Sequence, residues 1–297
     1  MISYNEVLGF VFLNLTVLGI VGNSFLLYLY GHKSITGQRT RPIDMIVIHM
    51  AFSNSVLILF GGVPKIMQVW ALKSFLDCNE VKILNYLMQA AQGLSLCSSC
   101  LLSVSQAITI SPYGPMWTGL KARAPKCTLP CCLLCWGLNL LIAIFIPIYM
   151  TCPRNSSKER WTIWSSSLNL HAINTIKIAI WKSVYDGVFV GLMAVTSGYM
   201  VLVLYRHQQQ VRHIHGTHMS PRASPETRAT KAILLLMVFF VCFTTISSPF
   251  SVHMVYSEET KHWVINGIII LSLCYPAVSP FILLSSDTQI TWACHGL

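Results

Sequence analysis

Residues 7–30 read VLGFVFLNLTVLGIVGNSFLLYLY, a stretch without Asp, Glu, Lys or Arg. A helix needs about 20 mainly apolar residues to cross the hydrocarbon core of a bilayer, where every backbone polar group must be satisfied within the helix. The stretch is therefore long enough to cross once. Six more stretches share these properties: 45–63, 83–110, 128–150, 187–205, 232–254 and 263–286. The pattern predicts an all-α integral membrane protein, a single seven-transmembrane helix bundle over residues 1–297.

The composition excludes a water-soluble fold. The 297 residues are 54% hydrophobic and 10% charged, whereas a soluble domain has roughly 25% charged residues. The mean hydropathy of +0.60 agrees with lipid as the main solvent. The formal net charge of +10 comes from short segments between the apolar stretches, where lipid headgroups and topology account for it. We therefore expect the lipid bilayer as a partner, and no nucleic acid.

The start of the chain indicates its orientation. No Lys or Arg precedes the first stretch and Glu6 does, so the basic region of a cleaved secretory signal is missing. We expect a multi-pass plasma-membrane protein with the N-terminus extracellular and the C-terminus cytoplasmic. Its cytoplasmic segments hold eleven Lys and Arg against nine outside, a count that places Lys65 outside; these segments are 31–42, 111–127, 206–231 and 287–297. Asn155-Ser156-Ser157, an acceptor for N-glycosylation, then lies outside.

The sequence carries no catalytic signature. It contains no H-E-x-x-H, no G-x-S-x-G and no phosphate-binding G-x-x-x-x-G-K. The apolar stretches lack the charged residues that ion-coupled transporters place at mid-membrane depth. We therefore predict no enzyme, no catalytic residue, no cofactor and no metal; His213, His215 and His218 are more typical of a solvated loop than of a metal site. A small transporter or channel is the alternative from another class.

A polar but uncharged interior suits a small, fairly apolar ligand that shifts the packing of helices. Asn85, Gln89 and Gln92 recur at i, i+4 and i+7 and so share one helix face in the outer half of a span. They either line a ligand pocket or hydrogen-bond to neighbouring helices. The outer ends of later spans supply the remaining ligand candidates: Tyr185, Asp186, Phe250 and His253. For Asp186, an ion pair with a loop lysine is the alternative.

Two cysteines and three prolines bear on the shape of the bundle. Cys78 and Cys152 lie near outer span ends, on the oxidising side, where a disulfide would tie a loop over the mouth of the bundle. Two free thiols are the alternative. Pro249, Pro276 and Pro280 lie inside apolar stretches, where proline kinks a helix and frees carbonyl groups. Such kinks permit movement without requiring it.

Residues 220–230 read SPRASPETRAT and run directly into the sixth apolar stretch. This sequence closely resembles the third cytoplasmic loop of the vomeronasal type 1 receptors, which are pheromone receptors coupled to heterotrimeric G proteins. Shorter matches extend the resemblance over essentially the whole chain: Gly22-Asn23, 101–104, 108–112, 145–149 and Ser279-Pro280-Phe281. It implies a bundle of the G-protein-coupled receptor type and a chemosensory receptor for pheromones or other small semiochemicals.

The resemblance also implies roles for individual residues. The inner face would meet the heterotrimeric G protein through basic side chains: Arg206, Arg212, Arg222, Arg228 and Lys231. Compared with rhodopsin-like receptors, Asn54 stands in for an Asp, Ser279-Pro280 replaces Asn-Pro, and Asp-Arg-Tyr is absent, as is typical of the vomeronasal group. Trp164 stands where family members usually carry a loop cysteine, so either Cys152 substitutes or the loop is untied. An untied loop would favour a nonfunctional relic receptor, the remaining alternative.

Overall fold

The computed structural model describes residues 4–37, 41–70, 78–112, 114–149, 172–215, 225–256 and 262–286. Within these ranges every regular element is a helix, which confirms the all-α prediction. The helices are α1 (Tyr4–Ile35), α2 (Pro42–Val69), α3 (Cys78–Ile110), α4 (Pro115–Ala143), α5 (Phe145–Tyr149), α6 (Ala172–His215), α7 (Pro225–Tyr256) and α8 (His262–Ser286). All except the short α5 are long enough to cross a bilayer.

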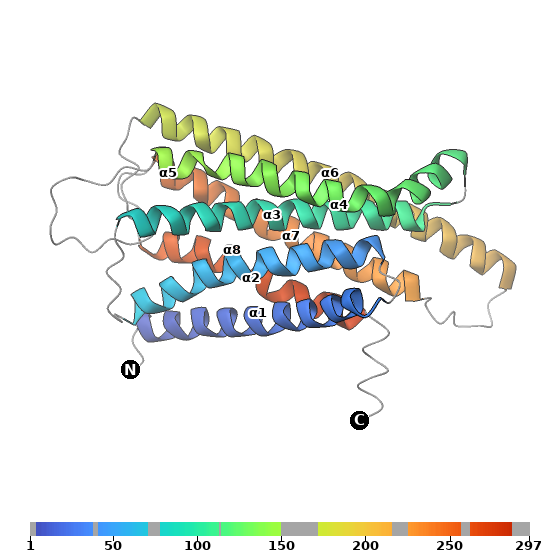
Figure 1. The fold of residues 1–297 in the computed structure, drawn as a ribbon, viewed down its shortest axis with the longest axis horizontal. Coiled ribbons are helices and arrows are strands. Elements are labelled where there is room, and N and C mark those ends of the chain that lie inside the picture. Colours follow the sequence, from blue (N-terminus) through green and yellow to red (C-terminus); the bar gives the residue numbers. More distant parts are fainter. Residues whose placement is uncertain are drawn as a thin grey trace, which may run out of the picture.

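The long helices lie side by side along the long axis of the molecule (Figure 1). α3 is central and packs against α2, α4, α6 and α7. α1 and α8 are parallel, because Leu8 shares a buried cluster with Ile269 while Gly22 lies against Pro280. α8 therefore ends at the opposite end of the bundle from the start of α1, as an odd number of crossings requires. We call the end at which α1 begins the amino end.

The outward faces of the bundle are apolar. On α6, Val184, Val188 and Val195 are 56%, 64% and 70% exposed. Six described helices are long and apolar enough to cross a membrane by length and composition, and a further apolar segment, Thr230–Ile246, lies in α7. Apolar surface of this kind is unfavourable in water at about 25 cal/mol per Å² and favourable in lipid. The protein is a multi-pass membrane protein with the seven-helix architecture that the sequence predicts.

The fourth predicted span is not one continuous helix. α4 ends at Ala143, Ile144 forms a turn, and α5 begins at Phe145. Pro147 accounts for the break, because its ring clashes with the carbonyl of the residue four positions earlier, which is Ala143, and its nitrogen has no hydrogen to donate. The break therefore lies at the residue whose carbonyl Pro147 excludes from helical hydrogen bonding.

The second span is longer than its apolar stretch. α2 continues past residue 63 to Val69 and includes Pro64. Lys65, which the charge count placed outside a span, lies in this helix and is only 6% exposed. The predicted span ends before the helix does, because hydropathy ends a span near the first charged residue while the helix itself continues.

The main core joins seven helices. Its fully or largely buried side chains include one or more from every long helix: Leu26, Ile46, Met50, Leu102, Cys132, Met200, Leu236 and Leu283. A second cluster near the amino end, with Phe12, Ile58 and Leu273, joins α1, α2 and α8. Between these apolar clusters lie the buried polar side chains from which the candidate site is built.

Candidate functional site

Asn54 is the centre of a buried polar network. Its side chain is fully buried, and its amide oxygen accepts a hydrogen bond of 2.7 Å from the Ser95 hydroxyl of α3. Its amide nitrogen donates to the Ser279 hydroxyl of α8 at 3.1 Å and to the Asn23 amide oxygen of α1 at 3.4 Å. In hydrocarbon these groups have no water to bond instead. One side chain of α2 therefore joins three other helices.

Asn23 satisfies a carbonyl that proline leaves free. In a regular helix the Pro276 carbonyl would accept from the nitrogen four residues on, but that residue is Pro280, which has no N–H. The Asn23 amide nitrogen donates to this carbonyl at 2.9 Å. Gly22 permits the approach of α1, since a Cβ atom there would lie 2.7 Å from the Pro280 ring. The pairs Gly22-Asn23 and Ser279-Pro280 are thus two halves of one contact.

A second contact links α3 to α8 and α7. The hydroxyl groups of Ser99 and Tyr275 lie 2.5 Å apart, and Ser99 also donates to the Ser95 carbonyl at 2.7 Å. The Tyr275 ring meets Phe240 of α7 edge to face, with 4.6 Å between ring centroids. The Phe240 ring of α7 thus contacts the tyrosine that is paired with Ser99 of α3.

The predicted amides of α3 face the interior of the bundle. Asn85, Gln89 and Gln92 continue at helical spacing into Ser99, which contacts α8, and Ser103, which contacts α6. This stripe therefore points to the space between α6 and α8. Ser99 and Ser103 are fully buried, whereas the three amides nearer the amino end are half-buried. The polar side chains of this stripe are thus less deeply buried toward the amino end than toward the opposite end.

Tyr185 holds α6 against two helices. Its hydroxyl donates to the Asn139 amide oxygen of α4 at 3.2 Å and lies 3.2 Å from the Cys97 sulfur of α3. The Asn139 amide nitrogen donates to the Cys135 carbonyl at 2.8 Å. Gly93 makes room for Asn139, because a Cβ atom at position 93 would overlap the Asn139 amide oxygen. The sequence predicts Tyr185 as a ligand candidate. It does not reveal that Tyr185 contacts two other helices, one of them through Asn139.

Neutral hydrogen bonds join α3 to α6 and α7 at the end opposite the amino end. The Gln106 amide nitrogen donates to the Thr230 hydroxyl of α7 at 2.8 Å, and both side chains are buried. The hydroxyl groups of Ser111 and Tyr199 lie 2.9 Å apart, and the Tyr199 ring stacks on Trp117 of α4 at 5.5 Å. Neutral side chains thus link both α6 and α7 to the end of α3 that lies opposite the amino end.

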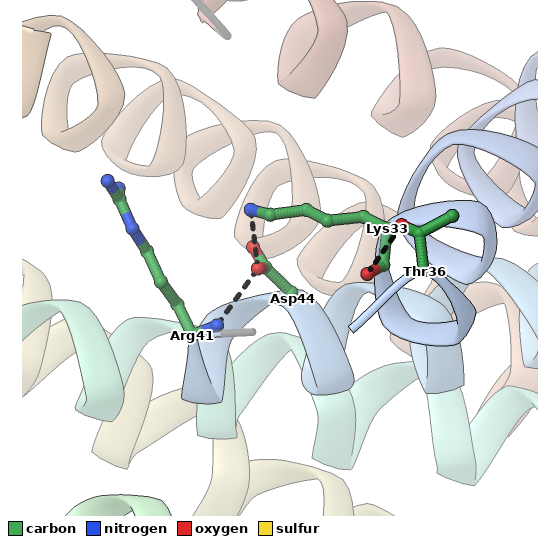
Figure 2. Close-up of polar contacts among 4 residues, drawn as sticks. All are labelled: Lys33, Thr36, Arg41 and Asp44. Atoms are coloured by element: carbon green, nitrogen blue, oxygen red, sulfur yellow. Dashed lines mark hydrogen bonds and ion pairs between the residues drawn. The ribbon is translucent and has the colours of Figure 1, made fainter. Parts of the chain in front are cut away.

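Charged side chains at that end hold helix termini. Asp44 accepts from the Lys33 ammonium at 2.7 Å and from the Arg41 backbone N–H at 2.9 Å, and Figure 2 shows both contacts converging on one carboxylate oxygen. Lys121 donates to the Ser111 carbonyl at 2.7 Å, just beyond the end of α3. A carboxylate at a helix start and an ammonium at a helix end both complement the helix dipole.

The structure describes only some of the predicted site residues. Arg206 and Lys231 are exposed, and Asp186 is half-buried. The side chains of four others, which lie in α6 or α7, are outside the described residues: Arg212, Arg228, Phe250 and His253. Cys78 begins α3, but its side chain is also outside them, as are Cys152, Asn155 and Arg222 entirely. The disulfide, glycosylation and G-protein contacts therefore stay predictions.

Two residues that the sequence reasoning did not select belong to the interior. Asn139 and Gln106 are buried amides within apolar stretches, a pattern that indicates helix–helix hydrogen bonding. The eight cysteines whose side chains the structure describes are free. Within the described part of the chain, no three His, Cys, Asp or Glu side chains gather as they would around a metal ion.

Comparison with known proteins gives consistent relatives. A profile of the vomeronasal organ pheromone receptor family matches residues 7–296. Human vomeronasal type-1 receptor 3 is 36% identical over 98% of this chain and 94% of its own length. Human vomeronasal type-1 receptor 1 is 34% identical over 97% of this chain and 82% of its own length. Olfactory receptor class A-like protein 1 of Danio rerio is 32% identical over 95% and 90%, respectively.

These matches cover the whole bundle and confirm the resemblance seen in the sequence. They identify a G-protein-coupled chemosensory receptor, not an enzyme, and none of them favours a transporter or a relic. The Asn54 network and the amide stripe of α3 thus lie within a receptor bundle. The chain belongs to the vomeronasal organ pheromone receptor family.

Proposed function

We propose that the receptor binds a small pheromone-like molecule in the half of the bundle nearest the amino end and transmits binding to a heterotrimeric G protein at the opposite end. The observation that carries the proposal is the stripe of α3. Asn85, Gln89 and Gln92 face the interior and are half-buried, while Ser99 and Ser103 on the same face are fully buried. A ligand that contacts the amides would lie on the amino-end side of the fully buried Ser99 and Ser103.

The way the helices are linked supports a signalling role. α6 is joined to α3 by hydrogen bonds between neutral side chains, among them the 2.6 Å bond of Thr196, and α7 by the 2.8 Å bond of Thr230. A ligand can shift such a bundle between two packings only by its difference in affinity for them. A ligand between α6 and α8 would contact both of these helices and α3. Its affinity would therefore depend on how far α6 lies from α3 and α8.

Calcium responses of cells that express the receptor with a G protein test the binding site. We expect Gln89→Ala and Gln92→Ala to lower the potency of an activating odorant at least tenfold at equal surface expression. Asn14→Ala is the matched control, because Asn14 is an exposed amide on α1 that bonds only its own helix, at the Phe10 carbonyl. Equal potency in both interior variants would remove these residues from the site.

The proposal includes an orientation in the plasma membrane. The amino end and Asn155 would face outward, and the basic segment with Arg206, Arg212, Arg222, Arg228 and Lys231 would face the G protein. The opposite positions of the start of α1 and the end of α8 support this arrangement. Epitope tags accessible at the N-terminus only, with loss of a glycan in Asn155→Gln, are the expected results. Tags accessible at both ends would refute it.

We further propose that a disulfide between Cys78 and Cys152 ties a loop over the amino end of the bundle. Phe250, His253 and Asp186 would lie near the ligand. Support comes from the placement of Cys78 at the first residue of α3, at the amino end. Removing such a bridge costs about 2 to 4 kcal/mol in folded proteins. We expect Cys78→Ser and Cys152→Ser to reduce surface expression equally, and the double variant no further. Unequal losses would contradict the pairing.

A further inference from the structure

Two cysteine pairs lie in neighbouring helices of the bundle. Cys97 and Cys100 form a C-x-x-C in α3, and Cys132 and Cys135 form another in α4. All four are free thiols. Cys100 and Cys132 are each 3% exposed and belong to the main apolar core. Their burial there is explained by packing, so the question is what the other two cysteines do.

Contacts on both sides of these motifs set the register of α3 against α4. The Ser111 carbonyl, just beyond the end of α3, accepts from Lys121 near the start of α4. Eighteen residues earlier in α3, Gly93 lies against Asn139, which is eighteen residues later in α4. The two helices are therefore antiparallel. In this register each cysteine of α3 is level with one of α4: position 97 with 135, and position 100 with 132.

The Cys97 and Cys135 thiols are within hydrogen-bonding reach of each other. Gly93 permits this approach, because a Cβ atom one turn before Cys97 would overlap the Asn139 amide oxygen. The Asn139 amide nitrogen donates to the Cys97 sulfur at 3.3 Å, and the Tyr185 hydroxyl of α6 lies 3.2 Å from the same sulfur. A thiol pair that joins two helices thus has polar groups beside it.

The two thiols differ in access and in surroundings. Cys97 is 1% exposed, whereas Cys135 is half-buried and next to the outward-facing Leu134, which is 62% exposed. A reagent dissolved in the bilayer therefore reaches Cys135 first. A cysteine in purely apolar surroundings is ordinarily unreactive, because nothing stabilises its thiolate. The amide that donates to Cys97 supplies this stabilisation, since hydrogen bonds strengthen when the acceptor gains charge.

We propose that Cys97 and Cys135 are an oxidation site, at which a hydroperoxide dissolved in the bilayer forms a disulfide between α3 and α4. The Cys135 sulfur attacks the hydroperoxide and becomes a sulfenic acid, while its thiol proton leaves with the alcohol product. The Cys97 sulfur then displaces the hydroxyl group, which takes the Cys97 proton and leaves as water. Two thiols are oxidised by two electrons, and the hydroperoxide is reduced to an alcohol and water.

The disulfide would fix the register of α4 against α3 beside the contact that Tyr185 of α6 makes with both helices. Formation of this bond requires neither an odorant nor a G protein. The inference therefore stands apart from the proposed ligand site, and each can fail without the other.

Disulfide mapping tests the pair directly. Membranes that contain the full-length receptor are treated with cumene hydroperoxide, free thiols are blocked with N-ethylmaleimide during denaturation, and the peptides are analysed by mass spectrometry. We expect a peptide pair joined through Cys97 and Cys135 that is absent without the oxidant and is lost after dithiothreitol. No new disulfide, or a new one between Cys100 and Cys132 only, would overturn the inference.

Serine variants assign the reaction to these two thiols. Cys97→Ser and Cys135→Ser should each abolish the loss of two maleimide-reactive thiols that the oxidant causes in the unaltered receptor. Cys100→Ser in α3 and Cys132→Ser in α4 are the matched controls, because each makes the same substitution one turn away, and both should retain the loss. A control variant that abolished it while still folded would place the reaction elsewhere and overturn the inference.

A sulfenic acid trap separates the roles of the two sulfur atoms. In Cys97→Ser no neighbouring thiol consumes the sulfenic acid, so dimedone should label Cys135 after treatment with the hydroperoxide. In Cys135→Ser, dimedone should label Cys97 at least tenfold less, because that sulfur is the less accessible one. Equal or greater labelling of Cys97 would overturn the order of the two steps, and labelling of neither would overturn the oxidation site itself.

Discussion

The two sides of the bundle are held together differently. α1, α2, α3 and α8 share a continuous buried network, in which Asn54 alone reaches three helices. α6 is much less buried in the bundle: 11% of its most apolar stretch is buried, against 67% for α3. In hydrocarbon a broken polar network finds no water to replace its bonds, whereas an apolar helix face moves along lipid at little cost. We therefore expect the first side to act as a frame and the second to move more easily.

The frame should be most sensitive at its centre. Asn54→Leu removes the acceptor of Ser95 and the donor to Ser279 in a fully buried position. Stranded polar groups cost about 1 to 3 kcal/mol each, so we expect a loss of roughly 3 kcal/mol in stability, visible as a lower unfolding temperature in detergent and poor surface expression. Asn14→Leu, at an exposed amide of α1, is the control and should change little. Equal stability of the two variants would remove the distinction between frame and periphery.

The contact between α3 and α4 is the next most sensitive point. Gly93→Ala places a methyl group where the Asn139 amide oxygen lies and forces that side chain away from Tyr185. Overpacking a close contact costs typically 1 to 3 kcal/mol, so we expect about 2 kcal/mol, measured as loss of thermal stability. Gly137→Ala on α4 is the matched control, because nothing lies within 4 Å of an added Cβ atom there. A stable Gly93→Ala receptor would show that α4 moves aside easily.

Much of the frame can be predicted from the sequence, for a physical reason. The bilayer imposes length and apolarity on each span, so the seven long helices follow from runs such as 7–30. Pro147 explains the break at Ile144, but the sequence alone does not single it out, because Pro125 and Pro130 lie inside the unbroken α4. Asn54 and Ser279 were singled out only through the resemblance, since one sequence does not reveal that they meet.

The interior contacts could not be predicted, because they depend on how helices face one another. Lys65 ends an apolar run, and a sequence alone does not tell an interior lysine from a loop lysine. Asn139 lies on Gly93 only in one rotation and one register of α3 against α4. Tyr185 was selected as a ligand-binding candidate, whereas the contacts it makes, with Asn139 and Cys97, come from helices remote in sequence.

The movable side should respond in signalling more than in stability. Gln106→Leu removes the buried hydrogen bond to Thr230 that ties α7 to α3. Hydrogen bonds between membrane helices are worth about 0.6 kcal/mol on average, which corresponds to roughly a threefold shift between two packings. We therefore expect basal signalling to rise about threefold at equal surface expression. Thr230→Val should have a similar effect and the double variant little more. Unchanged basal signalling would mean that this bond is equally present in both packings.

The smallest effect is expected where charge lies at the helix ends. Lys33→Met removes the ammonium 2.7 Å from Asp44, but the carboxylate keeps the Arg41 backbone N–H and the favourable dipole at the start of α2. Partly exposed ion pairs contribute at most about 1 kcal/mol, so we expect about 0.3 kcal/mol, close to the limit of a thermal unfolding measurement. Asp44→Ala also removes the acceptor of the Arg41 N–H and should cost about 1 kcal/mol. Asp44→Asn retains an acceptor oxygen and should lie between the two. If Lys33→Met instead cost as much as Asp44→Ala, the ion pair itself would hold the first two helices together, and the frame would depend on charge as well as on its neutral network.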